Sequence, residues 1–228
     1  MKIEVLVFQG CPHANEAFAL TESVVRNLAP QAEVKMVFVE VGLLPREGFY
    51  GSPTILVNGR DIEGKKGASC GLTCRLYEGG KGVPPRWLIE TALLRALEPR
   101  NILFLCVNNS ARSQMAEGIA RKLLSPEIAV WSAGSEPTEV RNEAITVLGE
   151  IGIDISHHRP KSLGEIPVDK VDVVITLCAE EVCPLFFGKV TRLHWPLEDP
   201  TKLEIEEERL QAFRMVRDEL YKRISTIV

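Results

Sequence analysis

The chain has 228 residues and a formal net charge of −4, with 27 basic and 31 acidic side chains. Charges of both signs are mixed along the chain, so no basic face predicts nucleic-acid binding. No window is long and apolar enough to predict a membrane-spanning helix, and the first residues lack the pattern of a signal peptide. We therefore expect a cytoplasmic protein whose six cysteines serve catalysis, redox chemistry or metal binding rather than structural disulfides.

The first half of the chain is predicted to alternate strands and helices. The expected elements are a strand over residues 3–8, a helix bearing Phe18, Leu20, Val24, Val25 and Leu28, strands over 33–41 and 54–57, a turn at Asn58-Gly59 and a helix over 87–97. Glu98-Pro99-Arg100 ends that helix, and a new apolar strand follows at once. We therefore expect two α/β domains, residues 1–98 and 99–228, joined by a short linker.

Cys11 lies between the first predicted strand and the first predicted helix. The field at a helix N-terminus favours a thiolate there. Pro53 precedes the strand over 54–57, and we expect a cis peptide bond before it. With these features, residues 1–98 resemble the thioredoxin-like fold. The pattern departs from that fold at Ala14, which stands where a second active-site cysteine would be, so a Cys-x-x-Cys disulfide cannot form.

The second half of the chain also alternates strands and helices. The expected elements are a strand over 102–105, a helix from Arg112, a strand over 129–132, a turn at Ala133-Gly134, a helix over 138–151, strands over 171–177 and 190–194, and a helix over 203–227. This order predicts a doubly wound parallel sheet with its site at the carboxyl ends of the strands. Cys106, Cys178 and Asp199 each follow a strand, so we expect them at one edge of the sheet.

The residues from Cys106 to Ser113 are typical of a loop that holds an oxyanion against a thiolate. A strand, a tight loop and a helix N-terminus turn successive N–H groups toward one point, and the helix dipole favours an anion there. The same field makes the Cys106 thiolate a nucleophile near neutral pH. Arg112 can hold two oxygens of the anion with its planar guanidinium. The loop alone predicts nucleophilic attack on an oxyanion.

Further motifs extend this pattern along the second half. They are Gln114-Met115-Ala116-Glu117, Ser132-Ala133-Gly134, Gly152-Ile153-Asp154-Ile155-Ser156, Thr176-Leu177-Cys178, His194-Trp195 and Asp199-Pro200. With them, residues 100–228 resemble the thioredoxin-coupled arsenate reductases, which share the low-molecular-weight tyrosine phosphatase fold. Cys-x5-Arg by itself is moderately specific, but the same pattern followed in order by Cys178, Cys183 and Asp199-Pro200 is a strong signal.

This resemblance implies a cycle of thiol chemistry. The Cys106 thiolate would attack arsenate, and Asp199 would protonate the leaving oxygen as general acid. The residues expected to bind the anion and shape its loop are Asn109, Ser110, Ala111, Arg112 and Ser113. Cys178 would then attack Cys106 and release arsenite, and Cys183 would attack Cys178 and carry the disulfide toward the surface. We expect no tightly bound cofactor and no metal; an external thiol reductant, either thioredoxin or glutathione with glutaredoxin, would close the cycle.

Other interpretations of the same residues remain open. Cys178 could be a buried inert thiol, and the pair Cys178 and Cys183 could be half of a zinc site. Asp199 could be an ordinary turn residue. A low-molecular-weight protein tyrosine phosphatase would use Cys106, Arg112 and Asp199 without the other cysteines, although such enzymes usually have aromatic residues after Asp-Pro, where Thr201 stands here. A non-enzymatic protein that binds metalloids through its thiols is the third class.

Two departures from the reductase pattern concern particular residues. The spacing from Cys178 to Cys183 is shorter than in commonly described members, so the relay could differ in detail. Some relatives bind potassium behind the anion loop with an Asp that follows the position of His157 and His158, but here the segment reads Arg159-Pro160-Lys161-Ser162. Our hypothesis is that the ammonium of Lys161 takes the place of that cation; the alternative is an ordinary surface lysine. His157, His158 and His194 have no evident partner in the sequence, and we expect them to be structural or surface residues.

Cys70 and Cys74 lie in a glycine-rich segment that is predicted to be a loop. Either could resolve a mixed disulfide on Cys11, or the three thiols could hold arsenite or another soft ion. We expect the first domain to dock on the second and to act as a tethered reductant of the Cys178–Cys183 disulfide, because tethering gives an effective concentration of about millimolar. The alternative is a domain kept only for docking.

Overall fold

The computed structural model describes the chain except for residues 41–47, 67–72, 180–185, 187, 189 and 228. Cys70 and Cys183 lie outside the described residues, so the predictions made for them have no structural counterpart. The chain divides into two compact units, Met1–Glu98 and Pro99–Val228. No helix in the described ranges combines the length and apolar character needed to cross a membrane.

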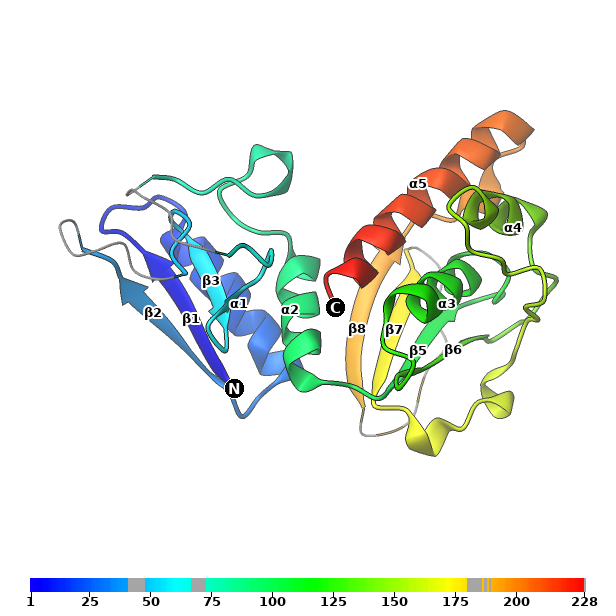
Figure 1. The fold of residues 1–228 in the computed structure, drawn as a ribbon, viewed down its shortest axis with the longest axis horizontal. Helices are drawn as coiled ribbons and strands as arrows, with labels where there is room; N and C mark the ends of the chain where they lie inside the picture. Colours follow the sequence, from blue (N-terminus) through cyan, green and yellow to red (C-terminus); the bar gives the residue numbers. More distant parts are fainter. Residues whose placement is uncertain (41–47, 67–72, 180–185, 187, 189, 228) are drawn as a thin grey trace. The chain divides into compact units, whose positions relative to one another are not determined.

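The first unit is built on a mixed four-stranded sheet (Figure 1). Its strands are β1 (Lys2–Val7), β2 (Glu33–Phe38), β3 (Thr54–Val57) and β4 (Arg60–Asp61), in the order β2-β1-β3-β4. β1 and β2 are parallel and connected by helix α1 (Ala14–Leu28), whereas β3 is antiparallel to β1 and to β4. Helix α2 (Arg86–Leu97) packs against α1, after a short 3-10 helix, η1 (Glu78–Gly80).

Several local predictions for the first unit are confirmed. Asn58 and Gly59 both have positive φ, 51° and 81°, as a two-residue turn between β3 and β4 requires. The peptide bond between Ser52 and Pro53 is cis. On α1, however, the buried face is made of Ala14, Ala17, Thr21, Val24, Val25 and Leu28. Phe18 and Leu20 are only half-buried, because they lie one residue to the side of that face.

The second unit is built on a parallel four-stranded sheet in the order β6-β5-β7-β8. The strands are β5 (Asn101–Cys106), β6 (Ala129–Gly134), β7 (Val173–Cys178) and β8 (Thr191–Leu197). The helices are α3 (Arg112–Leu123), α4 (Asn142–Gly149), α5 (Glu206–Ser225) and the short 3-10 helices η2 (Leu163–Glu165), η3 (Val168–Lys170) and η4 (Pro200–Lys202). The chain moves from β5 to one neighbour, β6, and then crosses to β7 and β8 on the other side. Such a reversal at β5 is where α/β sheets bind ligands.

Both faces of the parallel sheet are covered, as a sheet of this kind requires. On one face Leu103 and Leu105 of β5 pack with Val174 of β7 and with Ile166 and Val171 from the η2–η3 region. Side-chain alternation places Phe104 and Cys106 on the opposite face, and α3 packs against β5, β6 and α5. Cys106 therefore faces the helical layer of the unit.

Several predicted boundaries in the second unit are wrong: β8 runs to Leu197 instead of residue 194, α5 begins at Glu206 instead of residue 203, and two further differences bear on the Cys106 loop. β6 continues through Ala133 and Gly134, where we predicted a turn, because Gly134 pairs with Ser162 and its N–H donates to the carbonyl of Lys161 over 2.9 Å. α4 begins at Asn142 instead of residue 138. The residues before it make hydrogen bonds to the Cys106 loop instead of a first helical turn.

Candidate active site

The loop that joins β5 to α3 surrounds the sulfur of Cys106. Cys106 is 3% exposed, and its Sγ lies 2.9 Å from Oγ of Ser113. The Nδ2 group of Asn109 donates to Oγ of Ser113 and to Oγ of Ser132, each over 2.8 Å. Because the Ser113 oxygen accepts from Asn109, its own hydrogen is available to the sulfur of Cys106. The Ser113 hydroxyl is thus placed to donate to the sulfur of the predicted nucleophile.

The orientation of Asn109 follows from a backbone contact. The N–H of Lys161, which can only donate, lies 2.7 Å from Oδ1 of Asn109, so Nδ2 must face the two serines. Asn109 has a φ of 44°, in the left-handed region, and it is fully buried. Asn tolerates this conformation better than most residues. The side chain of Asn109 therefore connects the anion loop to the segment around Lys161.

The segment before α4 braces the outer side of the anion loop. The N–H groups of Glu136, Thr138 and Arg141 donate to the carbonyls of Val107, Asn108 and Ser110 over 2.9–3.0 Å. In a trans peptide unit the N–H points opposite to the C=O. The N–H groups of residues 108, 109 and 111 consequently point away from the brace, into the loop. This arrangement matches the nest of donors that an oxyanion needs.

Gly134, at the end of β6, is required by this close packing. A Cβ at this position would lie 2.3 Å from the carbonyl oxygen of Val107 and 2.8 Å from the N–H nitrogen of Asn109. Any other residue would displace the backbone of the loop. The shape of the anion loop thus depends on a strand that is adjacent in space and more than 20 residues later in the chain.

A charged and polar network lies behind the loop. Glu117 of α3 is 1% exposed and accepts hydrogen bonds from Oγ of Ser132 and, over 3.1 Å, from Nζ of Lys161. Arg121 forms a second ion pair with Glu117. Nζ of Lys161 also donates to the carbonyl of Arg159 over 3.1 Å. The Lys161 ammonium is therefore the ion-pair partner of the buried Glu117 carboxylate and is not a fully solvated surface charge.

His158 takes part in the same network, with a partner that the sequence did not indicate. Its Nδ1 lies 3.0 Å from Oε1 of Gln114, whose Nε2 donates to the carbonyl and to Oδ1 of Asn109. Burial lowers the pKa of His158 to about 4, so its ring is neutral at pH 7. His194 also has a partner, because its Nδ1 lies 2.8 Å from Oγ1 of Thr176. These contacts connect segments far apart in the chain, so no local pattern signals them.

Arg112 and Asp199 meet at the carboxyl edge of the sheet. Arg112 is 4% exposed; its Nη2 donates to Oδ2 of Asp199 over 3.0 Å, and its Nη1 donates to the carbonyl of Leu197 over 3.1 Å. The other carboxylate oxygen of Asp199 accepts from the N–H and the hydroxyl of Thr201. The acid predicted from the sequence is therefore held next to the guanidinium predicted to bind the anion.

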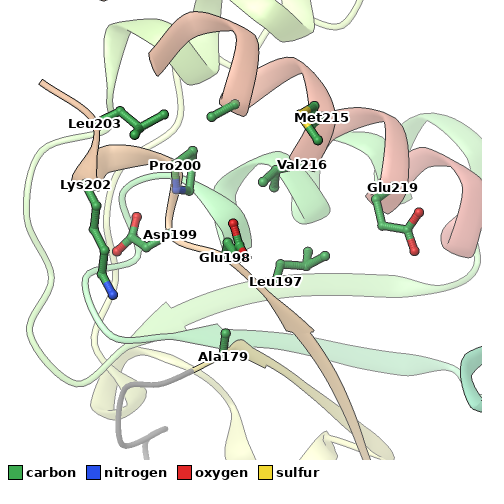
Figure 2. A pocket seen from close by; sticks show the side chains of 11 residues that line it. Ala179, Leu197, Glu198, Asp199, Pro200, Lys202, Leu203, Met215, Val216 and Glu219 are labelled. Atoms are coloured by element: carbon green, nitrogen blue, oxygen red, sulfur yellow. The ribbon is translucent and has the colours of Figure 1, made fainter. Parts of the chain in front are cut away.

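A hollow of about 600 Å³ adjoins Asp199, between the chain after β8 and helix α5. Figure 2 shows its lining side chains, with Met215 and Val216 of α5 on one side and Ala179 on the other. The residues of this hollow are Ala179, Leu197, Glu198, Asp199, Pro200, Lys202, Leu203, Ala212, Met215, Val216 and Glu219. Cys178, at the end of β7, is 1% exposed and does not line it. Cys178 ends the strand next to the one that ends in Cys106, since Leu105 pairs with Thr176.

Three of the predicted redox residues of the first unit, Cys11, Pro53 and Cys74, lie at one end of its sheet. Cys11 precedes α1 and is 9% exposed, whereas Cys74 is exposed and pairs with Ser52, the residue before Pro53. Neither Cys11 nor Cys74 forms a disulfide within the described part of the chain. Within the ranges that the structure covers, no three His, Cys, Asp or Glu side chains are arranged to hold a metal ion. The predicted site formed by Cys11, Cys70 and Cys74 includes Cys70, which lies outside those ranges.

Comparisons with known proteins concern the second unit. Residues 101–228 match the model of the low molecular weight phosphotyrosine protein phosphatase family. The chain is 46% identical over 128 residues to the arsenate reductase of Halalkalibacterium halodurans, covering 55% of this chain and 92% of that protein. It is 44% identical over 126 residues to the arsenate reductase of Shouchella clausii, covering 54% and 91%. A solved structure, an arsenate reductase in the phosphate binding state, is similar at 37% identity and a TM-score of 0.49, covering 55% of this chain and 93% of that one.

Proposed function

The chain belongs to the low molecular weight phosphotyrosine protein phosphatase family, and we propose that it is an enzyme that reduces arsenate to arsenite. The observation that carries this function is the similarity of the second unit to two arsenate reductases. The sequence identities are 46% and 44%, over more than nine-tenths of the length of those proteins. The site is consistent with it, because a thiolate, a nest of N–H groups and an arginine converge where a tetrahedral oxyanion would bind.

We propose that Cys106 begins the reaction. The anion loop and Arg112 bind the oxygens of arsenate, and the thiolate of Cys106 attacks the arsenic. One As–O bond breaks, and Asp199 gives its proton to the leaving oxygen, which departs as water. An arsenate that recruits Arg112 competes with Asp199 for the guanidinium and leaves the carboxyl group of Asp199 beside the substrate. The hydroxyl of Ser113 lies 2.9 Å from the attacking sulfur.

Cys178 and Cys183 are proposed to supply the two electrons. The thiolate of Cys178 attacks Sγ of Cys106, the electron pair of the As–S bond remains on arsenic, and arsenite leaves. The thiolate of Cys183 then attacks Cys178, which frees Cys106 and leaves a Cys178–Cys183 disulfide. Cys178 is buried at the end of β7, and the next residue, Ala179, lines the hollow beside Asp199.

The disulfide is proposed to be reduced by a thiol protein, either thioredoxin or glutaredoxin with glutathione. The first unit, as a thioredoxin-like domain over residues 1–98 that docks on residues 99–228, is our candidate for an internal step in this electron transfer. Support comes from its strand order, β2-β1-β3-β4, and from Cys11 at the start of α1. A Cys11→Ser variant should turn over more slowly than the parent chain when external thioredoxin is limiting. Equal rates would remove the first unit from the cycle.

The test of the function is a pair of assays on the same chain. Arsenate should drive oxidation of NADPH in the presence of thioredoxin and thioredoxin reductase, and Cys106→Ser should abolish it. Cys178→Ser should stop after arsenate has bound to Cys106, while leaving hydrolysis of an aryl phosphate unchanged. An aryl phosphatase activity without any arsenate-dependent oxidation would favour the tyrosine phosphatase alternative. Stoichiometric arsenite binding without turnover would favour a metalloid-binding protein.

A further inference from the structure

In the first unit, the segment Thr73-Cys74-Arg75 lies against the turn Gly51-Ser52-Pro53. The N–H of Ser52 donates to the carbonyl of Thr73 over 2.9 Å, and the N–H of Arg75 donates to the carbonyl of Ser52 over 3.0 Å. Cys74 is therefore the direct bridge partner of Ser52. The two backbones are so close at Gly51 that a Cβ there would lie 3.0 Å from the Thr73 oxygen and 3.2 Å from the Arg75 nitrogen.

The buried side chain of Arg75 holds residues 73–75 in place through its ion pairs. It is 1% exposed and bidentate to Asp61, at 2.6 Å and 2.9 Å, and it also pairs with Glu63 at 2.6 Å. The guanidinium lies 4.6 Å from the ring centre of Tyr77, whose hydroxyl donates to the carbonyl of Pro53. Bidentate ion pairs of this kind impose a defined geometry. Cys74 is thus an exposed thiol on a segment whose position is set by buried contacts.

The same turn also holds the segment that carries Cys11. Oγ of Ser52 accepts from the N–H of Phe8 over 3.3 Å, and the carbonyl of Phe8 accepts from the N–H of Cys11 over 3.2 Å. Ser52 therefore contacts both cysteine-bearing segments, one through its backbone and the other through its hydroxyl. Paired strands lie about 5 Å apart, which brings Cys74 to the end of the sheet where α1 begins.

We propose that Cys11 and Cys74 are the redox pair of the first unit, with Cys74 in the role that Ala14 cannot fill. In the step we infer, one of the two thiolates attacks a disulfide and forms a mixed disulfide, and the displaced thiolate takes up a proton. The second thiolate then attacks the mixed disulfide, and the remaining thiol leaves. One disulfide is reduced to two thiols, and Cys11 and Cys74 are oxidised to one disulfide. Only the source of the incoming disulfide, Cys178–Cys183, rests on the proposed function.

The test uses the full chain with Cys106, Cys178 and Cys183 replaced by Ser, so that its result does not depend on arsenate. The protein is equilibrated with reduced and oxidised glutathione, the remaining thiols are alkylated, and the disulfides are mapped by mass spectrometry. We expect a Cys11–Cys74 disulfide that persists when Cys70→Ser is added and disappears with Cys74→Ser. A Cys11–Cys70 disulfide, or glutathione retained on Cys11 with no internal disulfide, would overturn the proposal.

A second pair of variants tests the position of the segment. Gly51→Ala should push residues 73–75 away from the turn and lower the equilibrium constant for the Cys11–Cys74 disulfide, measured against glutathione, by at least about tenfold. Gly59→Ala is the matched control, because Gly59 also has a positive φ, 81°, but no atom lies within 4 Å of an added Cβ. Circular dichroism establishes that both variants fold. Equal constants for the two variants would contradict the proposed geometry.

Discussion

The guanidinium of Arg112 donates to the carboxylate of Asp199 over 3.0 Å, although 87 residues separate them in the chain. Arg112 begins α3, and Asp199 follows β8, at the far side of the sheet from β6. The ion pair places the proposed general acid next to the group that we propose binds the anion. In the proposed mechanism, arsenate therefore competes with Asp199 for Arg112 on entering the site.

Asp199→Asn is expected to lower kcat for arsenate reduction by about 10²–10⁴, because the leaving oxygen then lacks a proton donor. The KM for arsenate should stay the same or fall, since Arg112 and the anion loop are retained and the Asp199 carboxylate no longer pairs with the guanidinium. Steady-state NADPH oxidation with saturating thioredoxin measures both. Glu198→Gln, at the neighbouring residue of the hollow, is the control and should leave kcat within about twofold. A similar kcat for both variants would argue against Asp199 as the acid.

Gly134→Ala should distort the anion loop. The added Cβ would meet the Val107 oxygen and the Asn109 nitrogen, and overpacking of this kind costs about 1–3 kcal/mol in the free energy of unfolding. We expect kcat/KM for arsenate to fall by about 10² or more, because the donors of the loop shift from their positions. Gly149→Ala is the control, since no atom lies within 4 Å of an added Cβ there. Urea unfolding and steady-state assays on both variants decide the matter.

We propose that Lys161 is an internal cation for the site, because its ammonium pairs with buried Glu117 behind the anion loop. The parent chain should then give equal rates in sodium and potassium buffers of the same ionic strength. Lys161→Ala should lose about 1–3 kcal/mol of stability and become activated by potassium, which can replace the missing charge. Lys170→Ala, at an exposed lysine of η3, should behave like the parent. Clear potassium activation of the parent chain would refute the proposal.

The lowered pKa of His158 predicts a loss of stability in mild acid. Its folded-state pKa of about 4 lies below the ordinary value of about 6.5, so between these pH values the unfolded chain binds more protons than the folded one. The contribution of His158 to the free energy of unfolding should therefore be complete above pH about 6.5 and be lost as the pH drops toward 4. We expect this residue to contribute about 1–2 kcal/mol of that loss, after allowing for its partial exposure.

His158→Asn tests this contribution. An Asn amide can keep a hydrogen bond to Oε1 of Gln114 without titrating, so the variant should show a flatter stability profile between pH 6.5 and 4. His157→Asn, at the exposed neighbour, should retain the slope of the parent. Urea unfolding midpoints at several pH values provide the measurement. A parent-like slope in His158→Asn would show that other groups cause the acid sensitivity.

The fold was predictable wherever a pattern is local. The β5–loop–α3 order around Cys106, the Asn58-Gly59 turn and the cis bond before Pro53 depend on a few adjacent residues, and the structure agrees with each. The prediction of a helix from residue 138 was wrong because the backbone of residues 136–141 bonds to the anion loop. Helical periodicity carries no information about such a distant partner.

For the candidate site, residue types and spacing were enough to predict the reacting groups: Cys106 after a strand, Arg112 at a helix start and Asp199 before a proline. The contacts that hold them could be read only from the folded chain. The brace before α4, the contact of His158 with Gln114 and the pairing of Lys161 with Glu117 each join residues that a sheet brings together from distant segments. Likewise, the sequence gives the positions of Cys11, Cys70 and Cys74 along the chain but not which of them lie close together. The pairing of Ser52 with Cys74 depends on two loops that meet at one end of a sheet. The chemistry of a motif depends on neighbouring residues and can be predicted from them. Contacts between distant segments depend on packing, which no short stretch of sequence specifies.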